Sequence, residues 1–233
     1  MSETEHQLKM AAAESAVREV ADGMIVGLGT GSTAAFAVAA LGKRVSEGLR
    51  IVGIPSSEAT AAQARAAGIP LSTFAEEAHI DVTVDGADQV EEGSLNLVKG
   101  HGGALLREKI VAQASSRLLI VIHDSKLVSH LSLKDAVPIE VVPFGWQSTA
   151  RWLAKLGATP TLRQPQKDKP FVTDGGNYIL DCVFDENIPA EALAPQLDHV
   201  VGVVEHGFFI GLTSEVHVAR ASGVEVLKDR RRP

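Results

Sequence analysis

The chain reads MIVGLGTGSTA at residues 24–34, and this stretch decides the fold. Residues 24–28 form an apolar run typical of a buried strand, and the alanine-rich residues 34–41 predict a helix. The glycine loop Gly29 to Thr33 joins them. In such a unit the backbone amides of the loop and the dipole of the helix face the same point, which favours an anion. The stretch therefore predicts one unit of an α/β protein with an anion site at the start of its helix.

The loop also matches a dinucleotide-binding pattern, Gly29-x-Gly31-x-x-Ala34. That pattern requires an acidic residue about 20 positions further on. The second expected strand, residues 51–54, is instead followed by Pro55 and the hydroxyls of Ser56 and Ser57, which suit a phosphate or a sugar better. The Gly-Lys-Ser/Thr of a nucleoside-triphosphate loop does not occur in the sequence. A glycine turn that merely connects strand and helix stays an alternative for this loop alone.

Strands and helices alternate outward from this unit. The patterns predict helices at 8–21, 58–67 and 102–115, and strands near 70–72 and at 80–84 and 117–122. Residues 118–122 are apolar without alternation, which indicates a strand covered on both faces. This order is typical of a doubly wound, mainly parallel α/β sheet, whose ligands bind beyond the carboxyl ends of the strands. We expect four polar loops to meet at that edge: Gly29–Thr33, Ser56–Ser57, Asp85–Asp88 and His123–Lys126.

The rhythm changes after residue 131. Strands are expected at 138–142 and near 161–162, a hairpin at 171–173 and 178–184, a last strand at 200–204, and helices at 146–156 and 190–197. The succession βαββαβ is that of a ferredoxin-like α+β domain. We therefore predict a Rossmann-like domain made of residues 1–132 and 207–233, with an inserted ferredoxin-like domain at 133–206. Residues 208–212 and 224–227 are expected to return to the first sheet.

Composition narrows the class of protein. A net charge of −7 and 4% aromatic residues over 233 residues argue against a nucleic-acid partner, and the basic cluster at Lys228 and 230–232 is expected to be a solvated tail. No apolar run reaches the roughly 18 residues of a membrane helix. Cys182 is the one cysteine, so a reducing, cytoplasmic location is expected, and the residue itself is expected in the core.

The chemistry is expected in residues 82–108. An apolar run there ends in Asp85 and Asp88, which are separated by Gly86 and Ala87. Lys99 then opens a glycine-rich turn that leads into a helix carrying Glu108. Buried acids and a lysine beside backbone amides are what a proton-transfer enzyme for a small phosphorylated substrate needs. Taken singly, Asp85 could be a turn residue and Glu108 an exposed helix charge.

A metal site is not expected, because the histidines show no ligand spacing. These are His6, His79, His130, His199, His206 and His217. His123, beside Asp124 and Lys126, could line the pocket or serve packing.

The chain resembles type A ribose-5-phosphate isomerase. The resemblance rests on three separate motifs, at residues 27–34, 85–88 and 99–109, which occur in the right order. The resemblance covers nearly the whole length, including the inserted domain. It implies interconversion of ribose 5-phosphate and ribulose 5-phosphate through a cis-enediolate, without metal or organic cofactor. The implied partner is a small sugar phosphate, and the implied assembly is a homodimer or a dimer of dimers.

The resemblance implies that Glu108 is the general base. The other implied site residues are Lys9, Thr30, Gly31, Ser32, Thr33, Asp85, Asp88, Lys99, Gly100, His101, Gly102 and Lys126. On the residues alone, Lys9 would be a solvated helix lysine.

Physical reasoning assigns further roles. Lys99 and the amides of Gly100 and Gly102 would meet the charge that develops on the substrate oxygen. Asp85, next to Lys99, would be the acid that opens the sugar ring, and Asp88 could fix the lysine or a sugar hydroxyl. Lys126 would hold the phosphate together with the hydroxyls of Ser32 and Thr33 or of Ser56 and Ser57.

One residue departs from the resemblance. His101 stands where the family usually has glycine, so the turn must avoid a glycine-only conformation there or gains a hydrogen-bond donor. A catalytically silent sugar-phosphate sensor of the same fold is the alternative function. We do not expect an output module in the few residues before Leu8, and Glu108, Asp85 and Lys99 together favour catalysis. A nicotinamide-dependent oxidoreductase is disfavoured by the missing acidic residue.

Overall fold

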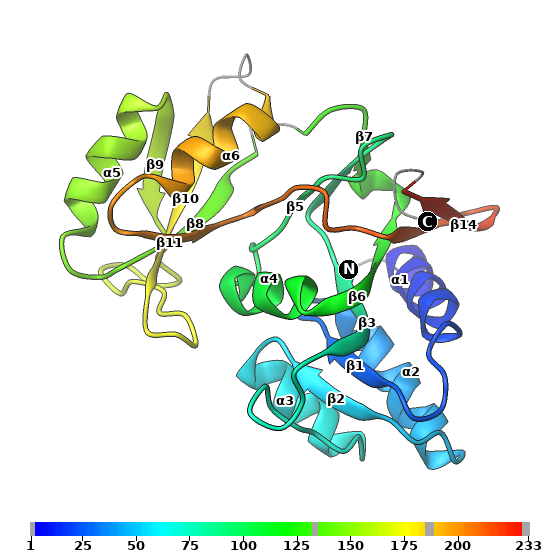
Figure 1. Ribbon diagram of the computed structural model, residues 1–233. Coiled ribbons are helices and arrows are strands. Elements are labelled where there is room, and N and C mark those ends of the chain that lie inside the picture. Colours follow the sequence, from blue (N-terminus) through cyan, green and yellow to red (C-terminus); the bar gives the residue numbers. More distant parts are fainter. Residues whose placement is uncertain (1–2, 132–134, 185–188, 230–233) are drawn as a thin grey trace.

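A six-stranded sheet forms the centre of the computed structural model, which describes residues 3–131, 135–184 and 189–229 (Figure 1). Its strand order is β14 (Gly223–Lys228), β13 (Glu215–Arg220), β6 (Ser115–His123), β3 (Ile80–Gly86), β1 (Ile25–Leu28) and β2 (Val52–Pro55). Every neighbouring pair is parallel except β13 and β14. The predicted mainly parallel α/β fold is therefore confirmed.

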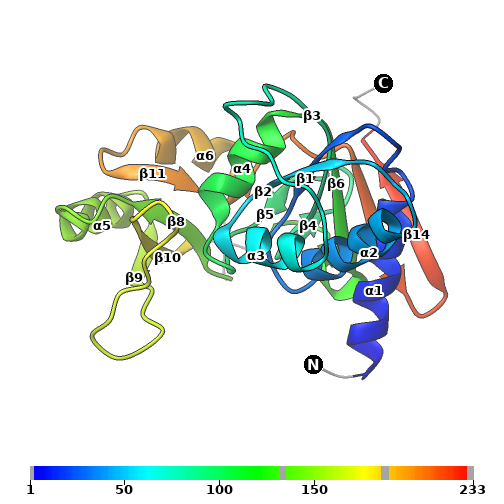
Figure 2. The ribbon, with the colours of Figure 1, turned by 90° about the horizontal axis from the view of Figure 1, so that it is seen from below.

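Helices cover both faces of this sheet (Figure 2). On one face lie α1 (Glu3–Val17) and α2 (Ala34–Ser46), on the other α4 (Leu105–Gln113), while α3 (Glu58–Ala66) packs against α2 and β2. Strand β6 shows why its sequence lacks alternation. Leu119 and Val121 join the core beneath α1 and α2, whereas Leu118, Ile120 and Ile122 join a core on the opposite face.

The sheet reverses its direction of growth beside β1. From β1 the chain crosses to β2 on one side, and it then returns to place β3 on the other side. Ligands of doubly wound sheets bind at such a switch point, outside the carboxyl ends of the strands. The loops that follow β1 and β3 meet there: the Gly29 amide donates to Val84 O at 3.0 Å and the Thr30 amide donates to Asp85 Oδ1 at 3.0 Å.

The second part of the chain forms a four-stranded unit with the expected βαββαβ succession. Its elements are β8 (Val137–Val141), α5 (Trp146–Lys155), β9 (Ala158–Leu162), β10 (Tyr178–Phe184), α6 (Ala190–Asp198) and β11 (Val203–His206). The spatial order is β11-β8-β10-β9. The predicted division of the chain into domains stays a prediction, and its first boundary falls at residues 132–134, outside the described residues.

The sequence patterns missed a small third sheet. It consists of β12 (Phe208–Phe209), β5 (Leu97–Val98), β4 (Gln89–Glu91) and β7 (Leu127–Val128), the last preceded by a 3-10 helix at Asp124–Lys126. Strands of two or three residues are too short to show a period. The expectation that residues 208–212 return to the main sheet was wrong, because Phe208–Phe209 pairs with β5. Residues 215–220 return instead, and 224–227 do so as expected.

Other boundaries also differ from expectation. Residues 171–173 are not a strand, because β9 and β8 are the partners of β10, and the strand near 70–72 is a single bridge from Leu71 to Gly53. Helix α1 spans 3–17 rather than 8–21. Helix α4 begins at Leu105, since Gly103 turns the chain with a φ of 82°. The expected solvated tail, residues 230–232, lies outside the described residues.

Gly29 carries the close approach of β1 to β3, and we predict that Gly29→Ala destabilises the protein. A Cβ at this position would lie 2.2 Å from Asp85 Oδ1 and 2.5 Å from Asp85 Cα. We expect the free energy of unfolding in urea to fall by roughly 1–3 kcal/mol, as overpacked sites do. Gly175→Ala is the matched control, because its Cβ would have only ordinary contacts, the nearest at 3.5 Å. Equal losses in both variants would contradict this account.

Candidate active site

A cavity of about 150 Å³ opens at the switch point. It is lined by Glu5, Lys9, Thr30, Gly31, Ser32, Thr33, Gly86, Ala87, Asp88, Lys99, Gly100, Gly102, Glu108, His123 and Lys126. The structure thus gathers most residues that the sequence singled out. Asp85, His101, Ser56 and Ser57 do not line this cavity.

Lys99 is the centre of the site. Its side chain is buried, and its ammonium lies 3.0 Å from Asp85 Oδ2 and 3.3 Å from Glu108 Oε1, while it also donates to the carbonyl of Gly86. Burial disfavours the ammonium, but the charges of Asp85 and Glu108 outweigh burial and raise the pKa of Lys99 above its ordinary value. Lys99 therefore stays a cation and brings a fixed positive charge to the cavity wall.

One carboxylate oxygen of Glu108 has no hydrogen-bond partner among the residues that the structure describes. The residue lies on the first turn of α4 and is 4% exposed. Its Oε1 faces Lys99, whereas its buried Oε2 has no hydrogen-bond partner among the described residues. Burial raises the pKa of Glu108 to about 8, against the attraction of Lys99. A buried carboxylate with an open lone pair and a pKa near neutrality has the properties of a general base.

Asp85 lies behind Lys99 rather than in the cavity wall. It is 1% exposed, and its carboxylate accepts from the amides of Thr30 and Gly86 and contacts Lys99. Burial raises the pKa of Asp85, while Lys99 and the two amides act to lower it. These contacts hold the lysine and the glycine loop together. They give less support to the expectation that Asp85 itself protonates a ligand.

Ser56 and Ser57 belong to a buried hydroxyl cluster with Thr30 and Thr60. Thr30 Oγ1 lies 2.7 Å from Ser56 Oγ, 2.8 Å from Ser57 Oγ and 3.1 Å from Thr60 Oγ1. Ser57 also caps α3 by accepting from the Thr60 amide. Ser56 and Ser57 were one of the two pairs expected to hold the phosphate. Their hydroxyls instead bind within this cluster and support the glycine loop through Thr30. Thr60 had no sequence signal beyond its place in the helix.

The other expected phosphate loop does line the cavity. Gly31, Ser32 and Thr33 precede α2, so the amino end of that helix faces the opening. Lys126 and Lys9 line the same cavity, and Lys9 donates to Ser32 of this loop. Amides at a helix N-terminus and two lysines make this side suited to an anion.

Lys9 is not the solvated lysine that the residues alone suggested. It is 6% exposed, contacts Glu5 at 2.7 Å and donates to Ser32 Oγ at 3.0 Å. Glu5 was missed, because the helix was expected to start at Leu8. Its i,i+4 spacing from Lys9 was the available signal.

His101 fits the turn of residues 99–103, called the catalytic turn below. Gly100 and Gly103 take the left-handed conformation, with φ of 109° and 82°, and His101 does not. Asp88 accepts from the His101 amide at 3.0 Å, and the ring donates through Nε2 to the carbonyl of Ala136 at 3.0 Å. The side chain thus binds the outer side of the turn and adds no donor to the cavity.

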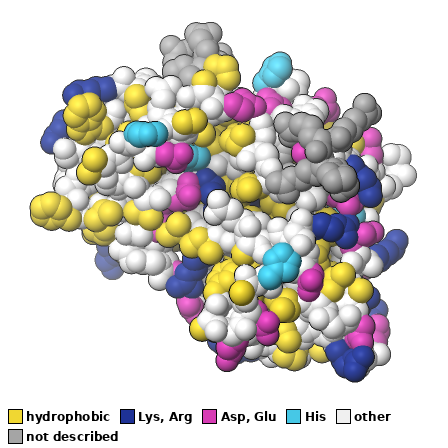
Figure 3. Space-filling model, in the orientation of Figure 1, with side chains coloured by type: hydrophobic (Ala, Val, Ile, Leu, Met, Phe, Trp, Pro, Cys, Tyr) yellow, Lys and Arg dark blue, Asp and Glu magenta, His cyan; other side chains and the backbone are white. Residues whose placement is uncertain are grey.

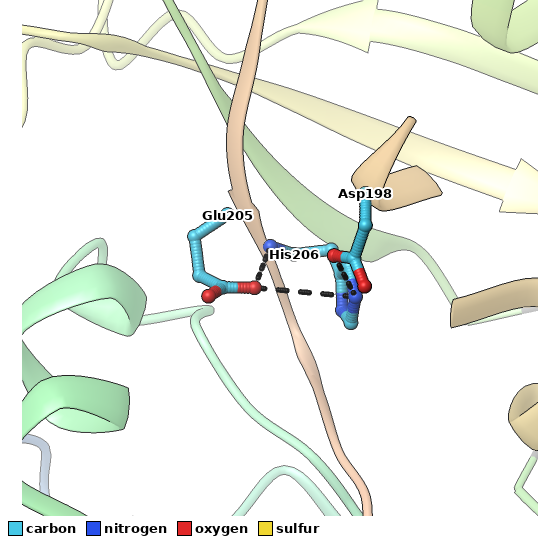
Figure 4. Close-up of side chains that lie close together, drawn as sticks. All are labelled: Asp198, Glu205 and His206. Atoms are coloured by element: carbon cyan, nitrogen blue, oxygen red, sulfur yellow. Dashed lines mark hydrogen bonds and ion pairs between the residues drawn. The ribbon is translucent and has the colours of Figure 1, made fainter. Parts of the chain in front are cut away.

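Figure 4 shows a second group of ionisable residues, none of which lines this cavity. Asp198, Glu205 and His206 each place one ligand-type atom within 4.8 Å of the others, although their spacing in sequence gave no sign of it. The ammonium of Lys109 already donates a hydrogen bond to Glu205 Oε1 at 2.6 Å. Burial and the charge of Lys109 lower the pKa of His206 to about 4.

The tautomer of His206 decides what this group can bind. Its Nδ1 accepts from the Phe208 amide at 3.3 Å, which leaves the proton on Nε2, 3.2 Å from Asp198 Oδ1. A metal would need that nitrogen unprotonated and would lie next to the Lys109 ammonium. The group therefore fits a hydrogen-bonded network that joins α4 to β11 and α6 better than a metal centre.

Fold and cavity together define an α/β protein with a buried acid–lysine site for a small anionic ligand. A family model described as ribose 5-phosphate isomerase A (phosphoriboisomerase A) matches residues 52–223. Ribose-5-phosphate isomerase A of Gloeobacter violaceus is 56% identical over 220 residues, covering 94% of this chain and 95% of the relative. The same enzyme of Gluconobacter oxydans is 51% identical and covers 93% and 94%.

Solved structures of ribose-5-phosphate isomerases are also similar to this chain. Ribose 5-phosphate isomerase A from Methanocaldococcus jannaschii matches with a TM-score of 0.90 at 38% identity, over 95% of this chain and 98% of that chain. A D-ribose-5-phosphate isomerase in complex with phospho-erythronic acid matches with a TM-score of 0.91 at 36% identity and the same coverage. The chain belongs to the ribose 5-phosphate isomerase A family, which is a family of isomerases.

Glu108 should make stability depend on pH, and Glu108→Gln tests this. The pKa of Glu108 is raised from 4.5 to about 8, so its contribution to stability is complete below pH 4.5 and is lost as the pH rises to about 8. Because glutamine does not ionise, we expect the variant to gain stability relative to the original protein across this range. Urea unfolding at several pH values measures the difference. The exposed Glu14→Gln is the control, and a difference that is flat with pH would contradict the raised pKa.

Proposed function

We propose that this protein interconverts D-ribose 5-phosphate and D-ribulose 5-phosphate through a cis-enediolate, with Glu108 as the base. The proposal is carried by Glu108 Oε2, which has no hydrogen-bond partner in the part of the chain that the structure describes. Glu108 lines a cavity that a buried lysine also lines. Family membership supports the substrate, as does the relative that holds phospho-erythronic acid. The reaction moves one proton between C1 and C2, so a single carboxylate can remove it and return it.

Lys99 is proposed to stabilise the negative charge that develops on the substrate oxygen. Its raised pKa keeps it cationic, and it lines the cavity together with Gly100 and Gly102. Fixed donors in a site with little water stabilise such a charge strongly. With this countercharge in place, the proposed reaction needs neither a metal nor an organic cofactor.

The phosphate is proposed to bind at the amino end of α2. Support comes from Ser32 and Thr33 at that helix end, and from Lys9 and Lys126, which line the same cavity. Gly31 and Thr30 complete the loop, and Gly86, Ala87 and Asp88 line the cavity from the β3 side. Asp88 is then available to a sugar hydroxyl.

Asp85 and His101 are proposed to act from outside the cavity. Asp85 fixes the position and the charge of Lys99, and its expected role as the acid in ring opening stays a prediction. His101 is proposed to support the turn that presents Gly100 and Gly102. Ser56 and Ser57 support Thr30 in the same indirect way.

We further propose a cytoplasmic homodimer, or a dimer of dimers. Large apolar side chains stand exposed on the four-stranded unit, among them Phe144 at 92%, Val201 at 91% and Trp152 at 56%. Hydrophobic side chains gather over the region of α5 in Figure 3, while Lys and Arg are interspersed with Asp and Glu elsewhere on that face. Exposed apolar patches are typical of association surfaces. The described helices include none long and apolar enough to cross a membrane.

Glu108→Gln should nearly abolish turnover while sugar phosphate still binds, because the amide keeps the shape of the side chain but does not accept the proton. Formation of ribulose 5-phosphate measures turnover, and calorimetric titration measures binding. Glu14→Gln, on the exposed face of α1, should retain full activity. Full activity of Glu108→Gln would disprove the role of Glu108 as the base. If the unaltered protein binds the sugar phosphate tightly without any turnover, the alternative of a catalytically silent sugar-phosphate sensor would be favoured.

The raised pKa of Glu108 predicts the pH dependence of the rate. The base works in its ionised form, so kcat/KM should rise with pH and level off near the pKa of Glu108, about 8. Lys99 stays charged over this range because its pKa is raised. Initial rates from acid to mildly alkaline pH check this. A profile that is level throughout the acid range would contradict a base with a raised pKa.

A further inference from the structure

We propose that Arg163, which follows β9 in the four-stranded unit, is a positioning residue that strengthens the anion-stabilising amide of Gly102. This inference rests on the proposed isomerase reaction. Arg163 does not line the cavity. It acts through the catalytic turn, whose outer carbonyls its guanidinium holds.

The contact is a fork on two consecutive carbonyls. Arg163 Nη1 donates to the carbonyl of Gly100 at 3.0 Å and to that of His101 at 3.1 Å. The His101 carbonyl and the Gly102 amide belong to one planar peptide unit, in which the two groups point in opposite directions. The Gly102 amide therefore points away from Arg163. No group of the described residues accepts its proton, and Gly102 lines the cavity.

A cation on the carbonyl side polarises the whole peptide unit. Hydrogen bonds in series strengthen one another, so the Gly102 N–H becomes a better donor to a negative oxygen in the cavity. The preceding peptide unit is fixed at both ends, because Arg163 binds the Gly100 carbonyl and Asp88 accepts from the His101 amide at 3.0 Å. The turn thus presents its amides before any charge develops on the substrate, which is the condition for efficient stabilisation.

Arg163 is itself held in place. Asp181 on β10 binds it through both carboxylate oxygens, with Nε donating to Oδ2 at 2.9 Å. The Phe171 ring lies 5.9 Å from the guanidinium carbon. The same ring packs so closely on Gly103 that a Cβ there would lie 2.4 Å from it. Through these contacts, the four-stranded unit packs against the catalytic turn at Asp181, Phe171 and Arg163.

Arg163→Met and Arg163→Lys test this role, with Arg151→Met as the control. Methionine removes the charge, while lysine keeps it without the planar fork. Arg151 is an exposed arginine on α5 of the same unit. The readouts are kcat and KM for ribose 5-phosphate, the affinity for phospho-erythronic acid, whose carboxylate carries a negative charge, and the affinity for inorganic phosphate. Thermal unfolding shows whether each variant is folded.

We expect Arg163→Met to lower kcat about tenfold with KM changed less than about twofold, since a donor used chiefly in the transition state is weakened. Phospho-erythronic acid should bind more weakly by a similar factor, inorganic phosphate should bind unchanged, and Arg163→Lys should lie in between. Arg151→Met should match the unaltered protein. Unchanged kcat in Arg163→Met would overturn the inference, as would a parallel loss of kcat and phosphate binding. An unaltered protein that forms no ribulose 5-phosphate would overturn the proposed reaction instead.

Discussion

The rest of the site depends on one buried ion cluster, in which Lys99 is shared by Asp85 and Glu108. Two carboxylates and one ammonium inside a protein leave one negative charge too many, so the cluster favours binding a proton. Burial, together with the negative charge of Asp85, raises the pKa of Glu108 to about 8, against the attraction of Lys99. The close packing of Gly29 on Asp85, the hydroxyl cluster behind Thr30 and the turn after Lys99 all serve to keep these three side chains at fixed distances.

Much of this arrangement could be predicted from local patterns. The run at 24–34 predicted the first βα unit and its loop, and the strand-end positions of Asp85 and Asp88 placed them at the same edge of the sheet. Glu108 was recognisable only through the combination of motifs, because one glutamate between an arginine and a lysine looks like any exposed helix charge. What defines it is a buried oxygen without a hydrogen-bond partner in the described ranges, and this arises from the packing around α4.

The remaining features depend on contacts distant in sequence. Nothing near Ser56 indicates that its hydroxyl faces Thr30 rather than a ligand. Arg163 lies 62 residues from His101, and only the docking of the four-stranded unit brings them together. The third sheet was missed for a related reason, because Phe208–Phe209 forms a strand only where Leu97–Val98 offers it an edge.

The burial of the Glu108 carboxylate also bears on what would happen to the hydrogen that it removes in the proposed reaction. The group is 4% exposed and lies in a cavity of about 150 Å³, little of which is left for solvent once a sugar phosphate occupies it. A hydrogen held on Oε2 then has few water molecules with which to exchange before it returns to carbon. An isotope placed at C2 of the aldose would consequently be carried over in part to C1 of the ketose. In the proposed reaction, burial of Glu108 would thus govern the fate of the label as well as the pKa of the base.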